Sequence, residues 1–88
     1  MKIIDLRSDT FTLPTKEMYD SIHNCELGDD VFNEDPTVNI LQEKAAKLIG
    51  TQSALLVPSG TMANLVSFLT HCERGNEVIL GDKSHTFI

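Results

Sequence analysis

The hydrophobic positions of the sequence fall into two kinds of pattern. In some stretches they recur every three or four residues, and in others they form short unbroken runs. Recurrence at helical spacing places apolar side chains on one face of a helix, whereas a short unbroken run is typical of a strand buried on both faces. The two kinds alternate along the second half of the chain, which predicts an α/β fold.

The most strongly predicted helix covers residues 36–49. Its apolar positions are Val38, Leu41, Ala45, Leu48 and Ile49. Asp35 and Pro36 are residue types favoured at the N-cap and at the first helical position. Gly50 suits the position that directly follows a helix. Both ends of this helix are therefore predicted as well as its apolar face.

A shorter helix is predicted to begin after Thr15. Threonine is a favourable N-cap, and Glu17 lies in the first turn, where the helix dipole stabilises an acid. Met18, Ile22 and Cys25 follow at helical spacing and give this helix a narrow apolar face. The pattern predicts a surface helix of a few turns.

Two unbroken apolar runs, residues 54–57 and 78–80, are predicted to be parallel strands. Between them a Pro-Ser-Gly turn at residues 58–60 leads into a third helix, so the order is strand, helix, strand. Such strands need helices on both faces of a sheet of several strands, and only two are visible. We therefore predict the first βαβ unit of a larger, mostly parallel sheet that is incomplete in this chain. Residues 1–14 are predicted to form an N-terminal arm, and residues 15–88 the start of a large domain.

The charge of the chain argues against several classes of partner. Asp and Glu number 13 and Lys and Arg number 7, so the formal net charge is -6. Nucleic acids and anionic membrane surfaces are bound by clustered basic residues, and neither partner is expected. No apolar stretch is long enough to span a bilayer, and the N-terminus does not resemble a signal peptide. A cytoplasmic location is therefore expected.

Metal binding is not predicted from the sequence either. Cys25 and Cys72 share no short-range motif of the kind that holds zinc, and nothing suggests a disulfide framework. The acids between Glu26 and Asp35 lack the alternate spacing and the central glycine of a calcium loop. We interpret this acidic stretch as a solvated loop with helix-capping carboxylates.

The turn at residues 58–61, Pro-Ser-Gly-Thr, is the first candidate for chemistry. A turn that leads into a helix presents free backbone N–H groups and the positive end of the helix dipole, which favour phosphate groups. Gly60 allows a ligand to approach the backbone, and the hydroxyls of Ser59 and Thr61 can donate to phosphate oxygens. The alternative is a plain turn with Ser59 or Thr61 as N-cap, and the pattern by itself favours this alternative.

His85 is the second candidate, because it follows the second predicted strand by five residues. Ligands of open parallel sheets bind outside the carboxyl ends of the strands, so His85 and the 58–61 turn are expected to face one crevice. Asp82 and Ser84 are near enough in sequence to orient its imidazole. Ser8 has no base beside it, so a Ser-His hydrolase is not predicted.

Several sequence blocks together resemble the N-terminal part of the low-specificity threonine aldolases. The blocks are LRSDT, GDDV, DPT, PSGTMAN, CERG and DKSH, and the resemblance covers nearly all of the 88 residues in the same order and spacing. The combination of blocks is specific at the level of the family.

This resemblance implies an enzyme that uses pyridoxal 5'-phosphate (PLP) and has the fold type I of PLP-dependent transferases. Such an enzyme cleaves L-threonine or L-allo-threonine to glycine and acetaldehyde and is a homo-oligomer, either a dimer or a tetramer. The residues that match Gly60 and Thr61 bind the cofactor phosphate. The residue that matches His85 stacks on the pyridine ring and is the candidate for handling the hydroxyl proton. The residue that matches Ser8 binds the substrate carboxylate.

The chain departs from the family pattern in two respects. Phe32 stands where the family usually has a tyrosine, which the resemblance places near an active site of the neighbouring subunit, and Asn33 often corresponds to glycine. The Schiff-base lysine, the partner of the pyridine nitrogen and the carboxylate-binding arginines all match positions beyond Ile88. None of the lysines present corresponds to the cofactor lysine, so residues 1–88 alone are expected to be inactive.

Two other functions fit the same residues. The first is another PLP-dependent lyase of the same fold type, which catalyses β-elimination and shares the phosphate turn and the ring histidine. The second is a small phosphate-binding module without catalytic activity. A lysine that follows a strand in Ser/Thr-rich surroundings would favour a PLP enzyme over the binding module.

Overall fold

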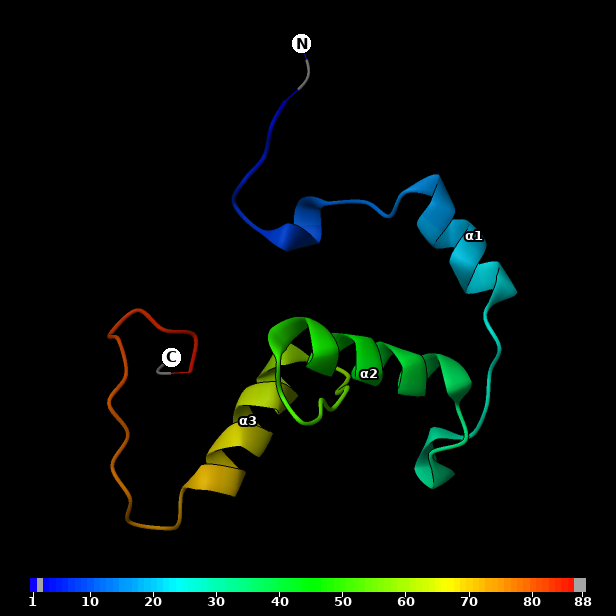
Figure 1. Ribbon diagram of the computed structural model, residues 1–88. Coiled ribbons are helices and arrows are strands. Elements are labelled where there is room, and N and C mark those ends of the chain that lie inside the picture. The colour runs from blue at the N-terminus through cyan, green and yellow to red at the C-terminus, as the bar shows by residue number, and fades with distance from the viewer. Residues whose placement is uncertain (2, 87–88) are drawn as a thin grey trace.

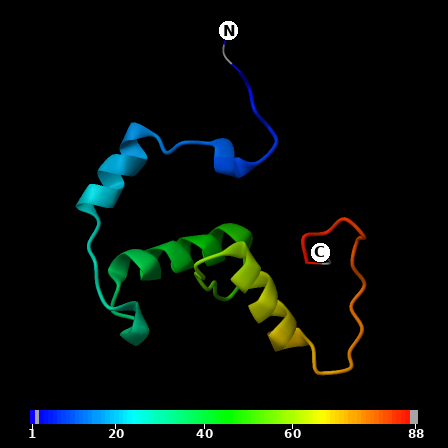
Figure 2. The same ribbon diagram turned by 180° about the vertical axis from the view of Figure 1, so that it is seen from behind.

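The structure is a computed structural model that describes residues 1 and 3–86. Within these residues the elements, in chain order, are η1 (Asp9–Phe11), α1 (Lys16–Asn24), η2 (Asp30–Phe32), α2 (Pro36–Ile49) and α3 (Gly60–His71), where η denotes a short 3-10 helix. Figure 1 shows the arm and α1 curving around α2 and α3, and the C-terminal segment running back beside α3. The opposite view in Figure 2 shows the same open arrangement.

All three predicted helices are confirmed. The predicted N-caps of α1 and α2 are correct, and of the two candidates for α3, Ser59 and Thr61, Ser59 is the N-cap. Each helix begins after a residue whose side-chain oxygen accepts a hydrogen bond from the backbone N–H three positions on. These residues are Thr15 for α1, Asp35 for α2 and Ser59 for α3. The helix α2 ends at Gly50, which adopts the left-handed conformation (φ 79°) that a residue without Cβ reaches at little cost. Short-range hydrogen bonds are sufficient to define these ends.

The predicted βαβ unit is wrong for this structure, since residues 3–86 contain no strand. Residues 54–57 and 78–80 lie apart in both views instead of pairing (Figures 1 and 2). The N–H of Leu56 donates to Oε1 of Gln42 at 2.8 Å, not to a neighbouring strand. Two parallel strands cannot bury their own faces, so an apolar run alone does not create a sheet. Residues 3–86 therefore form helices joined by extended connections, not the first unit of an α/β fold of the PLP-transferase type.

The chain is much more open than a compact domain of its length. Its Cα radius of gyration is 17.2 Å, whereas a compact domain of this length has a radius of about 12 Å. Its accessible surface is 8735 Å², against about 5,200 Å² for a folded monomer of this mass. Among the described residues only Ala46 and Asp35 are buried. Local hydrogen bonds, not a hydrophobic core, therefore define the shape.

Residues 26–39 form a loop that runs into the first turn of α2 and is closed by Asp35. Its Oδ1 accepts from the N–H of Val38 at 2.9 Å, and its Oδ2 accepts from the N–H of Gly28 at 3.2 Å. These two donors, Val38 above all, hold the pKa of the Asp35 carboxyl below its usual range. A methyl group at Gly28 would collide with the carbonyl oxygen of Glu34, so only glycine fits at that position.

The tip of this loop presents two apolar side chains to solvent. The η2 turn ends at Asn33, which is in the left-handed region (φ 58°). Asn39 holds this turn from α2, because its Nδ2 donates to the carbonyl oxygen of Asn33 at 2.9 Å. Val31 and Phe32 are 83% and 71% exposed. The backbone of the tip is thus held in place while its apolar side chains make little contact.

Candidate functional site

The first turn of α3 has two backbone donors that the helix does not use. Ser59 accepts from Met62 N–H with its Oγ (3.1 Å) and from Ala63 N–H with its carbonyl oxygen (3.0 Å). The N–H groups of Gly60 and Thr61 precede these bonds and have no acceptor within the described residues. They lie at the positive end of the helix dipole, where an anion is stabilised.

Gly60 leaves these donors accessible. Its φ is not in the left-handed region, and a Cβ built on it would meet nothing within 4 Å. Neither backbone strain nor packing against the described residues therefore requires glycine here. The absence of a side chain opens a direct approach to the N–H groups.

The start of α3 lines a hollow of about 530 Å³ that it shares with both ends of the chain. The lining residues are Ser8, Asp9, Thr10, Gly60, Thr61, Asn64 and His85. In Figure 1 the red C-terminal segment curls back toward this end of α3. The structure thus brings together all four residues that the sequence nominated, namely Ser8, Gly60, Thr61 and His85. A common crevice was expected for His85 and the 58–61 turn, although the sheet expected to create it does not form.

The arm contributes oxygen groups to this hollow. The Ser8 hydroxyl caps η1, accepting from the N–H of Thr10 at 3.3 Å and from its Oγ1 at 3.0 Å. It donates to Oδ1 of Asp9 at a longer distance of 3.4 Å. Ser8 therefore has a donor proton that is only weakly engaged. The hollow has an acidic arm side, at Asp9, and a donor-rich side at α3.

Arg7 gives the arm its local shape, which sequence reasoning did not anticipate. Its Nη2 lies 2.6 Å from Oδ2 of Asp5, its Nε lies 2.9 Å from Oδ1, and its guanidinium carbon is 4.4 Å from the centre of the Phe11 ring. The paired guanidinium lowers the pKa of the Asp5 carboxyl, and Asp5 raises the pKa of Arg7. The positive charge next to Ser8 is thus paired within the arm. The Asp-x-Arg spacing was the available signal.

His85 enters the hollow from a short turn near the end of the described chain. The N–H of Ser84 donates to the carbonyl oxygen of Gly81 at 3.0 Å, which closes this turn. The Ser84 hydroxyl lies 3.3 Å from Oγ1 of Thr86, and neither Ser84 nor Asp82 hydrogen-bonds to the imidazole within the described residues. The expectation that these two residues orient His85 is not met. The turn alone brings the imidazole to α3.

A second hollow of about 360 Å³ continues from the first. Its lining is Thr61, Asn64, Leu65, Phe68, His85 and Thr86. Thr61, Asn64 and His85 are common to both hollows, so they stand between a polar region near the arm and an apolar region along α3. Asn64 was not nominated from the sequence. Its spacing of three and four residues from Thr61 and Gly60 was the signal that it shares their helix face.

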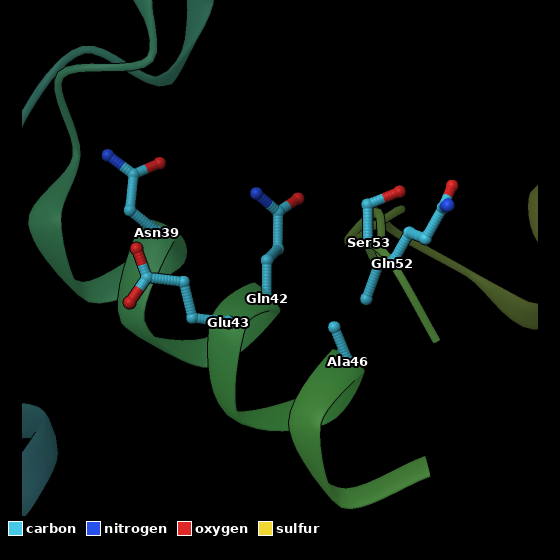
Figure 3. Close-up of a pocket in the computed structure, with 7 residues that line it drawn as sticks. Asn39, Gln42, Glu43, Ala46, Gln52 and Ser53 are labelled. Carbon is cyan, nitrogen blue, oxygen red and sulfur yellow. The ribbon is translucent and has the colours of Figure 1, made fainter. Parts of the chain in front are cut away.

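Another hollow, of about 300 Å³, lies between α2 and residues 52–54 and contains none of the nominated residues. Figure 3 shows Asn39 and Gln42 extending from the same side of α2, with Gln52 and Ser53 beyond them. The amides of Asn39 and Gln42 already bond to Asn33 and to the backbone of Leu56. This hollow is a junction between helix and loop.

No helix among the described residues is both long and apolar enough to cross a membrane. In the same part of the chain, no three His, Cys, Asp or Glu side chains are grouped so that they could hold a metal ion.

Comparison with known proteins connects these residues to one family. The family model described as beta-eliminating lyase matches residues 5–88. The low specificity L-threonine aldolase of Escherichia coli strain K12 is 50% identical over 86 residues, which are 98% of this chain and 26% of that protein. Low-specificity L-threonine aldolase 1 of Arabidopsis thaliana is 52% identical over 100% of this chain and 25% of its own. The corresponding protein of Saccharomyces cerevisiae is 37% identical over 94% of this chain and 22% of its own. The chain thus spans about a quarter of the length of these relatives.

Proposed function

The chain belongs to the beta-eliminating lyase family, and on this premise we propose that it forms the phosphate- and carboxylate-binding part of a PLP-dependent lyase. The reaction is the cleavage of L-threonine or L-allo-threonine to glycine and acetaldehyde, and the complete protein acts as a homodimer or homotetramer. The observation that carries this proposal is the hollow that gathers Ser8, Gly60, Thr61 and His85. The threonine aldolase names of the relatives support the choice of substrate.

The residues of the hollow fit the proposed cofactor. A phosphate group needs several converging donors, and the N–H groups of Gly60 and Thr61 and the Thr61 hydroxyl are available at the start of α3. The open space at the Cα of Gly60 lets phosphate oxygens come close to the backbone. A volume of about 530 Å³ is within the usual range for small-molecule sites.

Each of the other nominated residues has a role in this mechanism. When bound, PLP supplies an electron sink for the bond that breaks at the substrate Cα. The Ser8 hydroxyl can turn its proton from Asp9 to the substrate carboxylate, because its present bond is long at 3.4 Å. An imidazole nitrogen of His85 accepts the proton of the substrate β-hydroxyl, a transfer for which histidine is well suited near neutral pH.

The described lysines do not complete the site. Lys16, Lys44, Lys47 and Lys83 are absent from the lining of the hollow, and Lys2 lies outside the described residues. We therefore expect the covalent attachment of PLP to depend on a lysine beyond residues 1–88. Residues 1–88 mixed with PLP should release no glycine from threonine, and sustained turnover would contradict this expectation.

The proposed function is tested on the complete natural chain that carries residues 1–88. With PLP it should show the visible absorbance of protein-bound cofactor and should produce glycine and acetaldehyde from threonine in equal amounts. Failure to bind PLP would indicate a binding module. Release of pyruvate from serine or cysteine without threonine cleavage would indicate a β-eliminating lyase instead.

His85→Asn in the complete chain tests the role of the imidazole. We expect kcat/KM for threonine to fall about 100-fold, the usual contribution of a positioned acid or base. His71→Asn is the matched control, because His71 is on the last turn of α3 and does not line the hollow. An unchanged kcat/KM for His85→Asn would remove His85 from the mechanism.

A further inference from the structure

We propose that Asn64 is a further binding residue of this site, and that its carboxamide Nδ2–H donates to the phosphate group received by Gly60 and Thr61. The inference rests on the proposed function, since it concerns the phosphate of PLP. It adds a side-chain donor from the second turn of α3 to the backbone donors of the first turn.

The geometry of α3 directs Asn64 to the same region as the two backbone donors. Residues three and four apart lie on one face of a helix, and Asn64 has this spacing from Thr61 and Gly60. All three line the same hollow. Helical side chains lean toward the N-terminus of their helix, so the carboxamide of Asn64 leans over the first turn. Because Gly60 has no side chain, nothing on that residue blocks its way.

The carboxamide of Asn64 is also uncommitted, unlike the other polar groups further along α3. Ser67 donates its hydroxyl to the carbonyl oxygen of Ala63 at 2.8 Å, and Thr70 donates to that of Val66 at 2.7 Å. The side-chain hydrogen bonds found along α3 in the described residues involve Ser59, Ser67 and Thr70 but not Asn64. Asparagine is also a poorer helix former than alanine, so its presence here is not explained by the stability of the helix.

The chemistry of an amide suits an anion in a hollow that already contains the Asp9 carboxylate. A neutral N–H donor binds a phosphate oxygen by a charge-assisted hydrogen bond without adding a negative group. Its Oδ1 atom stays available to Thr61 or to water. Asn64 thereby extends the donor-rich side of the hollow along α3, toward His85.

The test compares two ligands that differ only in the phosphate group. PLP and pyridoxal are titrated into the cofactor-free complete chain, and dissociation constants are measured by absorbance or fluorescence. For Asn64→Ala we expect the Kd of PLP to rise about 10-fold, the value of a hydrogen bond to a charged group, and the Kd of pyridoxal to change less than about 2-fold. Asn64→Asp keeps the shape but places a carboxylate near phosphate, so its loss of PLP affinity should be larger.

Ser67→Ala is the matched control, since it changes a polar residue of α3 outside both hollows and should leave both constants unchanged. Circular dichroism of the cofactor-free variants verifies that they fold. Equal losses of PLP and pyridoxal, or no loss at all, would overturn the role of Asn64 while leaving the proposed function intact. Failure of the unmodified protein to bind PLP would overturn both.

Discussion

The loop at residues 26–39 and the segments on either side of α3 differ in where their backbone groups find partners. In the loop, Asp35 binds the N–H groups of Gly28 and Val38, and the Thr37 hydroxyl donates to the carbonyl oxygen of Glu26 at 2.6 Å. Within the part of the chain that the structure describes, the backbone of residues 54–57 makes one such bond, from Leu56 to Gln42, and that of residues 78–80 makes none.

Some parts of the chain can form their structure from nearby residues, and others cannot. The partners in the loop are at most eleven positions apart, as for Thr37 and Glu26, so closing it has a small entropic cost. An apolar run that is buried on both faces needs several neighbouring strands and covering helices. Ile79 is accordingly fully exposed and Leu55 is 71% exposed. The loop forms from hydrogen bonds among its own residues, whereas the apolar segments need neighbouring segments to cover them.

A pair of glycine substitutions gives the strongest expected contrast between the two regions. Gly28→Ala in the complete natural chain should lower the free energy of unfolding by about 1–3 kcal/mol, because its methyl collides with the backbone of Glu34. Gly81→Ala meets open space and has no left-handed φ, so stability should be unchanged or should increase by about 0.5 kcal/mol. Urea unfolding measures both. Equal losses of unfolding free energy for Gly28→Ala and Gly81→Ala would contradict the proposed difference between the loop and the segment after α3.

Lowering the pH should weaken the loop, because it protonates the carboxylate of Asp35. Hydrogen bonds from Val38 and Gly28 lower the pKa of Asp35 in the folded state, so its carboxylate stabilises the loop at pH values above about 3.9, the pKa of an unfolded aspartate. This stability is lost as the pH falls through the lower folded pKa. The amide proton shift of Val38 in a ¹⁵N-valine-labelled protein should titrate with a midpoint below 3.9.

Asp35→Asn serves as the control for this titration. Asparagine is an equally good N-cap but carries no charge, so the loop should persist and the acid titration of the Val38 amide should disappear. A Val38 midpoint at or above the ordinary aspartate value would show that Asp35 is not held by these donors.

The smallest expected effect on stability is that of Phe32→Tyr at the tip of the loop. Phe32 is 71% exposed, so the added hydroxyl should change the free energy of unfolding by less than about 0.5 kcal/mol. The resemblance to threonine aldolases implies a tyrosine near an active site of the neighbouring subunit. We therefore expect kcat/KM for threonine to change about 2- to 10-fold, the value of one hydrogen bond. An unchanged kcat/KM would mean that the position has no role in catalysis.

The helices could be predicted from the sequence, whereas the connections between them could not. Asp35, Ser59 and Thr15 act within three residues of their own position, so a residue type at the right place is sufficient to start a helix. The runs at residues 54–57 and 78–80 have the composition of buried strands. A β-like composition leads to a strand only where neighbouring segments pair with it and cover it. In the described residues no segment pairs with either run.

The residues of the candidate site could be predicted one by one, and a crevice shared by His85 and the 58–61 turn was expected from a sheet that does not form. Gly60, Thr61 and His85 stand out by their positions in turns and Ser8 by the resemblance alone. Asn64 was missed, although its spacing of three and four residues from Thr61 and Gly60 places it on their face of the predicted helix. The pairing of Arg7 with Asp5 was missed as well, although the two residues are only two positions apart.

The three helices, their N-caps and the loop closed by Asp35 depend on contacts between residues close along the chain, so local sequence is sufficient to specify them. The hollow that Ser8, the first turns of α3 and His85 surround depends instead on how distant segments are placed. The same is true of the two apolar runs, which remain unpaired. Contacts between distant segments depend on how the connecting chain is arranged in space, which local residue preferences do not specify.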